Sequence, residues 1–159
     1  MNVNNFMASM FQAMATEFRE GCEEEVKKHE KNIEDIKEGL RQTIEVSKFA
    51  LSDCDGDEEA VARIQKVRNL AIKSAMTEIK LLMKKNELSK YMSRMCDPTR
   101  ANSILISKGV VGGLSNEEID GHSKIVNEIQ ELNREMIEIF DEEQEVGIGS
   151  EGKYLEDMN

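Results

Sequence analysis

Between residues 18 and 44, apolar side chains recur at every third or fourth position, which is the spacing of an amphipathic α-helix. Glu, Lys, Asp and Gln occupy most of the positions between them. The stripe consists of Phe18, Cys22, Val26, His29, Ile33, Ile36, Leu40 and Ile44. The acidic stretch that follows, residues 52–57, is rich in turn formers and ends on Asp57, a residue suited to cap a new helix. The first helix is therefore expected to end near Leu51.

A second helix is predicted from Asp57 to about Met95, and it should stop before Pro98 because the residue that precedes a proline disfavours the helical region. Its broad apolar face consists of Val61, Ile64, Val67, Ala71, Ala75, Ile79, Leu82, Leu88, Tyr91, Met92 and Met95. Each helix would be about 55 Å long at about 1.5 Å per residue. Two long helices of similar length joined by a short turn favour an antiparallel hairpin.

A third substantial helix is predicted to begin after Ser115. Ser115 and Glu118 have the spacing of a capping box, in which each side chain bonds the backbone amide of the other residue. The apolar face of this helix consists of Ile119, His122, Val126, Ile129, Leu132, Met136 and Ile139. The helix should end by Gly147, and a short apolar helix is expected within residues 101–111.

These elements predict an all-α fold: a long antiparallel helical hairpin followed by shorter helices and an acidic C-terminal helix. The expected segments are an amphipathic N-terminal segment at 1–16, a hairpin core at 17–96, a short helix with a Gly-containing linker at 97–114, an acidic helix at 115–146 and a flexible tail at 147–159. The 4% of aromatic and 33% of charged residues agree, because long helices packed along a narrow seam have such a composition.

Charge lies in separate blocks along the chain. Residues 1–16 carry no charged side chain, residues 60–100 carry ten Lys or Arg against three acidic residues, and residues 101–159 carry 14 Asp or Glu against four basic residues. The net charge of −11 argues against general nucleic-acid binding. A chain of this kind can close on itself electrostatically, or exchange its acidic end for another anionic surface.

The N-terminal segment is a candidate for membrane insertion, because its apolar residues gather on one side of a helix. The candidate residues are Phe6, Met7, Met10, Phe11 and Met14. The alternative is that this segment continues the first long helix and packs on the hairpin. No stretch approaches the roughly 20 apolar residues of a membrane-spanning helix, so any attachment is expected to be peripheral.

The basic block is either a solvated helix face or a face for an anionic partner, where each basic residue near an anionic bilayer contributes about 1 kcal/mol. Its members are Arg63, Lys66, Arg68, Lys73, Lys80, Lys84, Lys85 and Lys90. The acidic helix is predicted to fold back near this face as an autoinhibitory element. Its apolar contacts would be Ile129, Leu132, Met136 and Ile139.

Motifs that suggest other chemistry lack the context that this chemistry needs. Asp53, Asp55 and Asp57 resemble the start of an EF-hand loop, but the sixth and twelfth positions lack the required Gly and Glu. Residues 147–152 match GxGxxG with neither a preceding strand nor a following helix. Three cysteines without CxxC spacing indicate free thiols in a reducing compartment, such as the cytoplasm. No catalytic residue, metal site or cofactor is expected, and the chain is predicted not to be an enzyme.

The order of these parts resembles that of ESCRT-III subunits, the charged multivesicular body proteins. The stretch IQELNREM at 129–136 is similar to the helix-four region of that family, and NIEDI at 32–36 gives a second match in the first long helix. The resemblance covers roughly residues 6–146. The chain departs from the family in the acidic start of its first helix, residues 17–25, and in YLEDM at 154–158, a poor match to the motif that docks the family's ATPase.

The resemblance implies a filament subunit for membrane remodelling and scission and for endosomal, multivesicular-body sorting. The implied partners are further copies or related subunits, an anionic membrane surface and a AAA disassembly ATPase, and the implied place is the cytoplasmic face of the endosomal membrane. A syntaxin-like or other coiled-coil adaptor in vesicle trafficking is the alternative, because residues 121–126 are similar to the start of a SNARE motif. A helical scaffold without a membrane role is a third interpretation.

Overall fold

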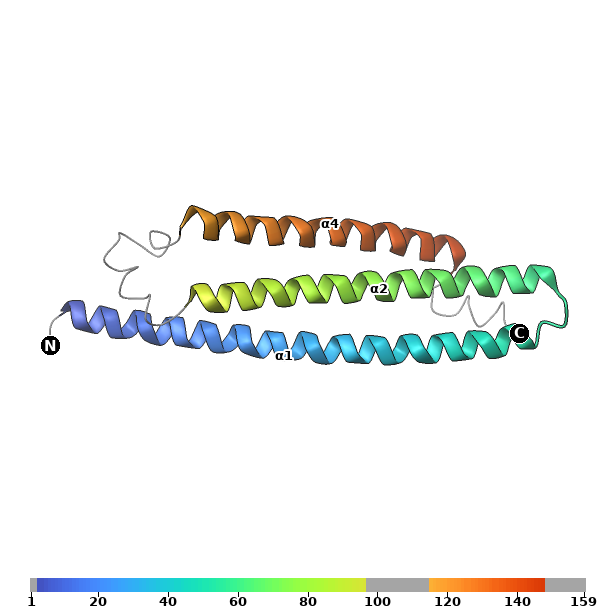
Figure 1. The fold of residues 1–159 in the computed structure, drawn as a ribbon, viewed down its shortest axis with the longest axis horizontal. Helices are drawn as coiled ribbons and strands as arrows, with labels where there is room; N and C mark the ends of the chain where they lie inside the picture. The colour runs from blue at the N-terminus through green and yellow to red at the C-terminus, as the bar shows by residue number, and fades with distance from the viewer. Residues whose placement is uncertain (1–2, 97–114, 148–159) are drawn as a thin grey trace. The chain divides into compact units, whose positions relative to one another are not determined.

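The computed structural model of the protein describes residues 3–96 and 115–147. They form three helices, α1 (Val3–Ser52), α2 (Glu58–Met95) and α4 (Asn116–Val146) (Figure 1). Every regular element among these residues is an α-helix, which confirms the predicted all-α class. The short helix expected within 101–111, the glycine linker and the tail with its 154–158 motif lie outside the described residues.

The first helix begins earlier than the segment boundaries expected from the sequence. α1 runs without interruption through residues 16 and 17, where the uncharged N-terminal segment was expected to give way to the hairpin core. The Thr16 hydroxyl donates to the Gln12 carbonyl at 2.9 Å, four residues back along the same helix. The N-terminal segment is thus a direct extension of α1, and nothing in its backbone separates it from the residues that follow.

A tight turn at residues 53–57 joins α1 to α2. The Asp57 amide donates to the Cys54 carbonyl at 2.9 Å. Asp55 and Gly56 have φ angles of 44° and 83°, in the left-handed region that glycine adopts freely and that aspartate tolerates better than most residues. The acidic stretch therefore serves as a turn, as the sequence predicted.

Both predicted helix starts are confirmed by their capping bonds. The Asp57 carboxylate accepts from the amides of Glu59 and Ala60, each at 3.1 Å, which satisfies two donors that the first turn of α2 leaves free. At the start of α4, the Glu118 amide donates to the Ser115 hydroxyl at 3.1 Å. The Ser115 amide donates in return to the Glu118 carboxylate at 3.4 Å, which completes the capping box.

Packing contacts divide the chain into two compact units. Unit 1 comprises Met1–Lys31 and Leu82–Ile129, and unit 2 comprises Asn32–Leu81 and Gln130–Asn159. Each unit holds a segment of α1, of α2 and of α4. The buried apolar side chains of the described residues are Cys22 and Ile125 in unit 1, and Leu70, Leu81 and Ile139 in unit 2. The core of each unit is therefore narrow, as the low aromatic content indicated.

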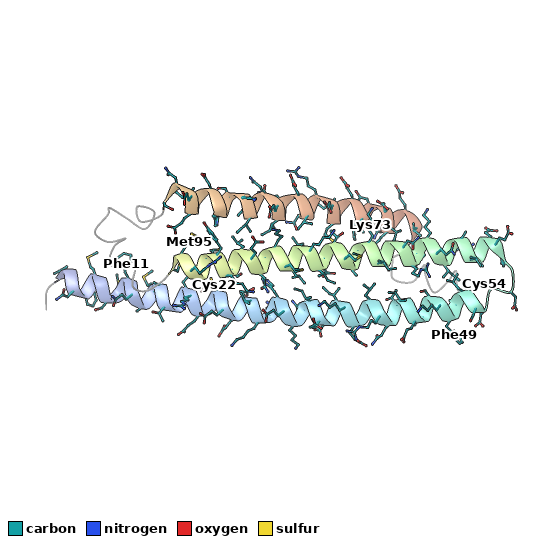
Figure 2. The ribbon with its side chains drawn as sticks, viewed as in Figure 1. Phe11, Cys22, Phe49, Cys54, Lys73 and Met95 are labelled. Carbon is teal, nitrogen blue, oxygen red and sulfur yellow. The ribbon has the colours of Figure 1, made fainter. Side chains whose placement is uncertain are left out.

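Two residues of the predicted apolar stripes do not lie inside. Phe18 is 44% exposed and Ile119 is 41% exposed, so their assignment to the core faces was wrong. α2 ends at Met95, close to Cys22 in Figure 2, so the turn of α1 that precedes Cys22 has little of α2 to pack against. Ile119 lies on a second face of α4, which is described below.

Candidate functional site

An exposed apolar stripe runs along the first turns of α1. Its members, here called the N-terminal stripe, are Val3, Phe6, Met7, Met10, Met14 and Phe18, with exposed fractions from 40% for Met7 to 69% for Val3. Four of the five predicted insertion residues belong to it, whereas Phe11 is half-buried (Figure 2). Within unit 1, α1 extends past the end of α2 (Figure 1), so much of this stripe has no contact with α2. Charged residues begin only at Glu17, so the stripe before it has uncharged flanks.

The predicted basic face of α2 is only partly available to a partner. Lys66, Lys80 and Lys90 are exposed, whereas Lys85 and Arg68 are half-buried. The Arg68 Nε is buried without a hydrogen-bond partner among the described residues. The remaining three members, Arg63, Lys73 and Lys84, lie within ion-pair distance of carboxylates.

Two of these lysines pair with carboxylates of α4. In unit 1, the Lys84 ammonium lies 2.6 Å from the Glu128 carboxylate and 2.8 Å from that of Glu87. The hydrogen bond to Glu128, and next the one to Glu87, raise the pKa of Lys84, and Lys84 in turn lowers the pKa of Glu128. In unit 2, Lys73 lies on the α4 side of α2, 3.0 Å from Glu142 (Figure 2). α4 thus occupies part of the basic face.

A closer contact joins the end of α2 to the start of α4 in unit 1. The Tyr91 hydroxyl donates to the Glu118 carbonyl at 2.6 Å. A Cβ atom added at Gly121 would lie 2.6 Å from the Tyr91 oxygen and 3.1 Å from the ring carbon that bears it. The Arg94 guanidinium lies 5.8 Å from the centre of the same ring, within the range of a cation–π contact. Gly121 is therefore a notch that admits Tyr91, and we call this the Tyr91–Gly121 contact.

The contacts with α2 define an inner seam of α4, spaced alternately by four and three residues. Its members are Gly121, Ile125, Glu128, Leu132, Glu135, Ile139 and Glu142. Ile125 and Ile139 are 6% and 2% exposed, and the three contacts with Tyr91, Lys84 and Lys73 all involve this seam or its first turn. Of the predicted autoinhibitory residues, Ile139 is buried and Ile129, Leu132 and Met136 are half-buried.

A second line of residues on α4, the outer seam, also keeps the spacing of three and four. Its members are Ile119, His122, Val126, Ile129, Asn133, Met136 and Phe140. Phe140 is 57% exposed, and Ile137 beside it is 61% exposed. The outer seam is more apolar than the inner one, yet it contains Ile119 and Phe140, two of the three large apolar side chains of α4 that are exposed.

A polar pair lies between α1 and α2 in unit 1. The His29 Nδ1 lies 2.9 Å from the Asn86 side-chain oxygen, and the His29 Nε2 lies 3.6 Å from the Glu25 carboxylate. Asn86 is 7% exposed, so this hydrogen bond satisfies a buried polar group. Nearby, burial and then the proximity of Cys96 raise the pKa of the Cys22 thiol, which keeps this thiol protonated.

In unit 2, an open groove of about 550 Å³ lies between the first turns of α2 and the end of α4. Its lining includes Lys66 and Lys73 on one side and Glu142 and Glu145 on the other. The described residues contain no group of three or more His, Cys, Asp or Glu side chains placed to hold a metal ion. None of the described helices combines the length and the apolar character that crossing a bilayer needs.

Comparison of the chain with protein-family models, with curated proteins and with solved structures gives no match. The features that bear on its function are the N-terminal stripe, the basic face of α2 and the two seams of α4.

Proposed function

We propose that the chain is a peripheral membrane protein, an ESCRT-III-like filament subunit for membrane remodelling and endosomal sorting on the cytoplasmic face of the membrane. In this proposal α1 and α2 form an antiparallel hairpin, α4 is the autoinhibitory element, and the partners are further copies, an anionic membrane and a disassembly ATPase. The hairpin is supported by the short turn at 53–57 and by the hydrogen bond between His29 and Asn86.

The observation that carries membrane attachment is the exposed N-terminal stripe. Apolar surface that remains in water is unfavourable, and full burial of a Phe or Met side chain stabilises by about 1.5–3 kcal/mol. An uncharged helix with such a stripe can lie in a bilayer interface with its apolar side among the acyl chains. The acidic residues that start at Glu17 limit insertion to the preceding turns, because an anionic surface repels them.

Competition for the same lysines supports the autoinhibitory part of the proposal. Lys73 and Lys84 pair with α4 carboxylates at 3.0 and 2.6 Å, and without α4 the Lys73 ammonium would be free to attract anionic lipid. Undocking of α4 would therefore add Lys73 to the exposed Lys66, Lys80 and Lys90, and it would leave Lys84 paired with Glu87 alone. The basic face of α2 would pair with α4 carboxylates in the closed form and with anionic lipid in the membrane-bound form.

The test is flotation with vesicles of phosphatidylcholine alone and with added phosphatidylserine. The full chain should float with the anionic vesicles, and Phe6→Asp/Met10→Asp should remain in the soluble fraction. The matched control is Val46→Asp/Phe49→Asp on the same helix, where the exposed fractions of 69% and 71% exceed the 56% and 44% of the first pair. Figure 2 shows Phe49 on the side of α1 that faces away from α2.

The control should still float, because the proposal places only the N-terminal turns in the bilayer. Equal loss of binding in both variants would show that apolar exposure or net charge alone governs the association. Unchanged binding of the Phe6/Met10 variant would mean that the N-terminal stripe has no role at the membrane, and the proposal would be wrong.

A further inference from the structure

The outer seam of α4 is a complete heptad pattern on one continuous helix. Its seven positions, from Ile119 to Phe140, alternate steps of three and four residues without exception, which is the 3.5-residue repeat of a coiled coil. At about 1.5 Å per residue the seam is about 30 Å long. Such a repeat places one narrow line of side chains against a second helix over its whole length.

This seam is only partly covered, although α4 already packs through its inner seam: His122, Val126, Ile129 and Met136 are half-buried. Phe140 and Ile137 remain 57% and 61% exposed, and Asn133 is exposed as well. The inner seam places acidic Glu128 and Glu142 against α2, while the more apolar outer seam has no such partner at its C-terminal half. α4 thus has a second face suited to pairing with a helix.

The distribution of charge around the seam bears on whether two copies of α4 can pair. α4 carries 11 acidic and two basic residues, so two copies repel each other over most of their surfaces. The positions that flank the outer seam are the exception, since only Glu118 among them is charged. These flanking positions are Ser123, Gln130, Ile137 and Gln144 on one side and Glu118, Ile125, Leu132 and Ile139 on the other.

Uncharged flanks give no basis for selecting a basic or an acidic partner helix, and they permit an identical helix. An anionic bilayer fits less well, because Glu138 and Asp141 lie close to the exposed Phe140. Asn133 occupies an a position of the repeat, where a single Asn favours a two-stranded, in-register pair by bonding its counterpart.

We propose that α4 pairs with α4 of a second copy of this chain along the outer seam, as a parallel, two-stranded coiled coil with a two-fold axis. Asn133 faces Asn133 of the other copy, and Phe140 is covered by the pairing. Such an interface is isologous and closes at two copies. The pairing needs neither a membrane nor the release of α4 from α2, so it stands or falls independently of the proposed function.

The first experiment measures the mass of the full chain in solution by light scattering or sedimentation, over a dilution series and without lipid. The expected mass is twice the 18.1 kDa of one chain, and it should fall to that of one chain on dilution. Ile137→Glu/Phe140→Glu should give one chain at every concentration. The matched control is Val46→Glu/Phe49→Glu, whose residues are at least as exposed on α1, and it should pair as the unaltered chain does.

A second experiment tests register and direction. In a chain with Cys22→Ala, Cys54→Ser and Cys96→Ser, Met136→Cys, at the d position that follows Asn133, should be joined to its counterpart by a short bis-maleimide, whereas Arg134→Cys, off the seam, should not. A single-chain mass at all concentrations, or pairing that survives Ile137→Glu/Phe140→Glu, overturns the proposed surface. Pairing without a crosslink at Met136→Cys overturns the parallel register.

Discussion

Because of the Tyr91–Gly121 contact, we expect Gly121→Ala to destabilise the protein, although glycine to alanine inside a helix ordinarily stabilises it. Gly→Ala inside an exposed helix stabilises by about 1 kcal/mol. At Gly121 the new Cβ would lie 2.6 Å from the Tyr91 oxygen, so the ring must move and its bond to the Glu118 carbonyl must break. The lost hydrogen bond costs about 1 kcal/mol and cancels the helix gain. The crowding remains, so Gly121→Ala should destabilise by about 1–3 kcal/mol.

Removal of the Tyr91 hydroxyl should reverse this sign. In Tyr91→Phe the hydrogen bond is already absent, and the nearest atoms to the new Cβ are ring carbons at 3.1 and 3.3 Å. Contacts of that length need a shift of only a few tenths of an ångström. Gly121→Ala in the Tyr91→Phe background should therefore be neutral or stabilising, by up to about 1 kcal/mol.

The assay is urea unfolding followed by circular dichroism at 222 nm, with hydrogen exchange of the α4 amides to report local undocking. The matched control is Gly39→Ala in α1, where a Cβ would meet nothing within 4 Å. This control should stabilise by about 1 kcal/mol. If Gly121→Ala stabilises as much as Gly39→Ala, or if its effect is the same with and without the Tyr91 hydroxyl, the contact contributes nothing.

Two further predictions follow from polar contacts of unit 1. Asn86→Leu should destabilise the protein by about 1–3 kcal/mol, because the half-buried His29 loses its hydrogen-bond partner. The double variant His29→Leu/Asn86→Leu should recover most of this loss in the same urea assay. A double variant that is no more stable than Asn86→Leu would contradict this. Because Lys84 lowers the pKa of Glu128 below its ordinary 4.5, Glu128 contributes stability that is present above pH 4.5 and is lost as the pH falls through its folded pKa. Glu128→Gln should flatten the fall of the urea midpoint as the pH drops below about 5 relative to the unaltered chain, and an unchanged slope would refute a role for this pair.

The helix boundaries were predictable because local chemistry sets them. Asp57 and Ser115 cap their helices with their own side chains, and Gly147 has a φ of 83° just after α4. Each of these helix ends is therefore determined by residues within a few positions of it. The extension of α1 to Val3 was left open, because an uncharged, Met-rich segment has the same pattern whether it continues a helix or lies alone on a membrane. Local patterns cannot decide between these two surroundings.

Which face each helix buries was harder to predict, because α2 and α4 each have two faces to fill. The sequence stripe of α2 omitted Leu70 and Leu81, which lie three turns apart and are 6% and 8% exposed. Leu70 lines the groove beside Glu142, so it lies on the face of α2 that packs against α4. On α4, a spacing of three and four fits the inner and the outer seam equally well, and the predicted face mixed the two. A glycine inside a helix can mark a close approach, as Gly121 does, but Gly21 and Gly39 give the same signal and a Cβ there would meet nothing within 4 Å.

The composition of the inner seam indicates that α4 is held only weakly against α2. Glu128, Glu135 and Glu142 occupy every second seam position, so only the positions between them bury apolar surface. Exposed ion pairs contribute little to stability and are screened by salt. The last turn of α4 carries acidic and no basic residues, at the end of the helix where the dipole disfavours negative charge. The C-terminal end of α4 should therefore leave α2 first and release Lys73, while the Tyr91–Gly121 contact retains the other end.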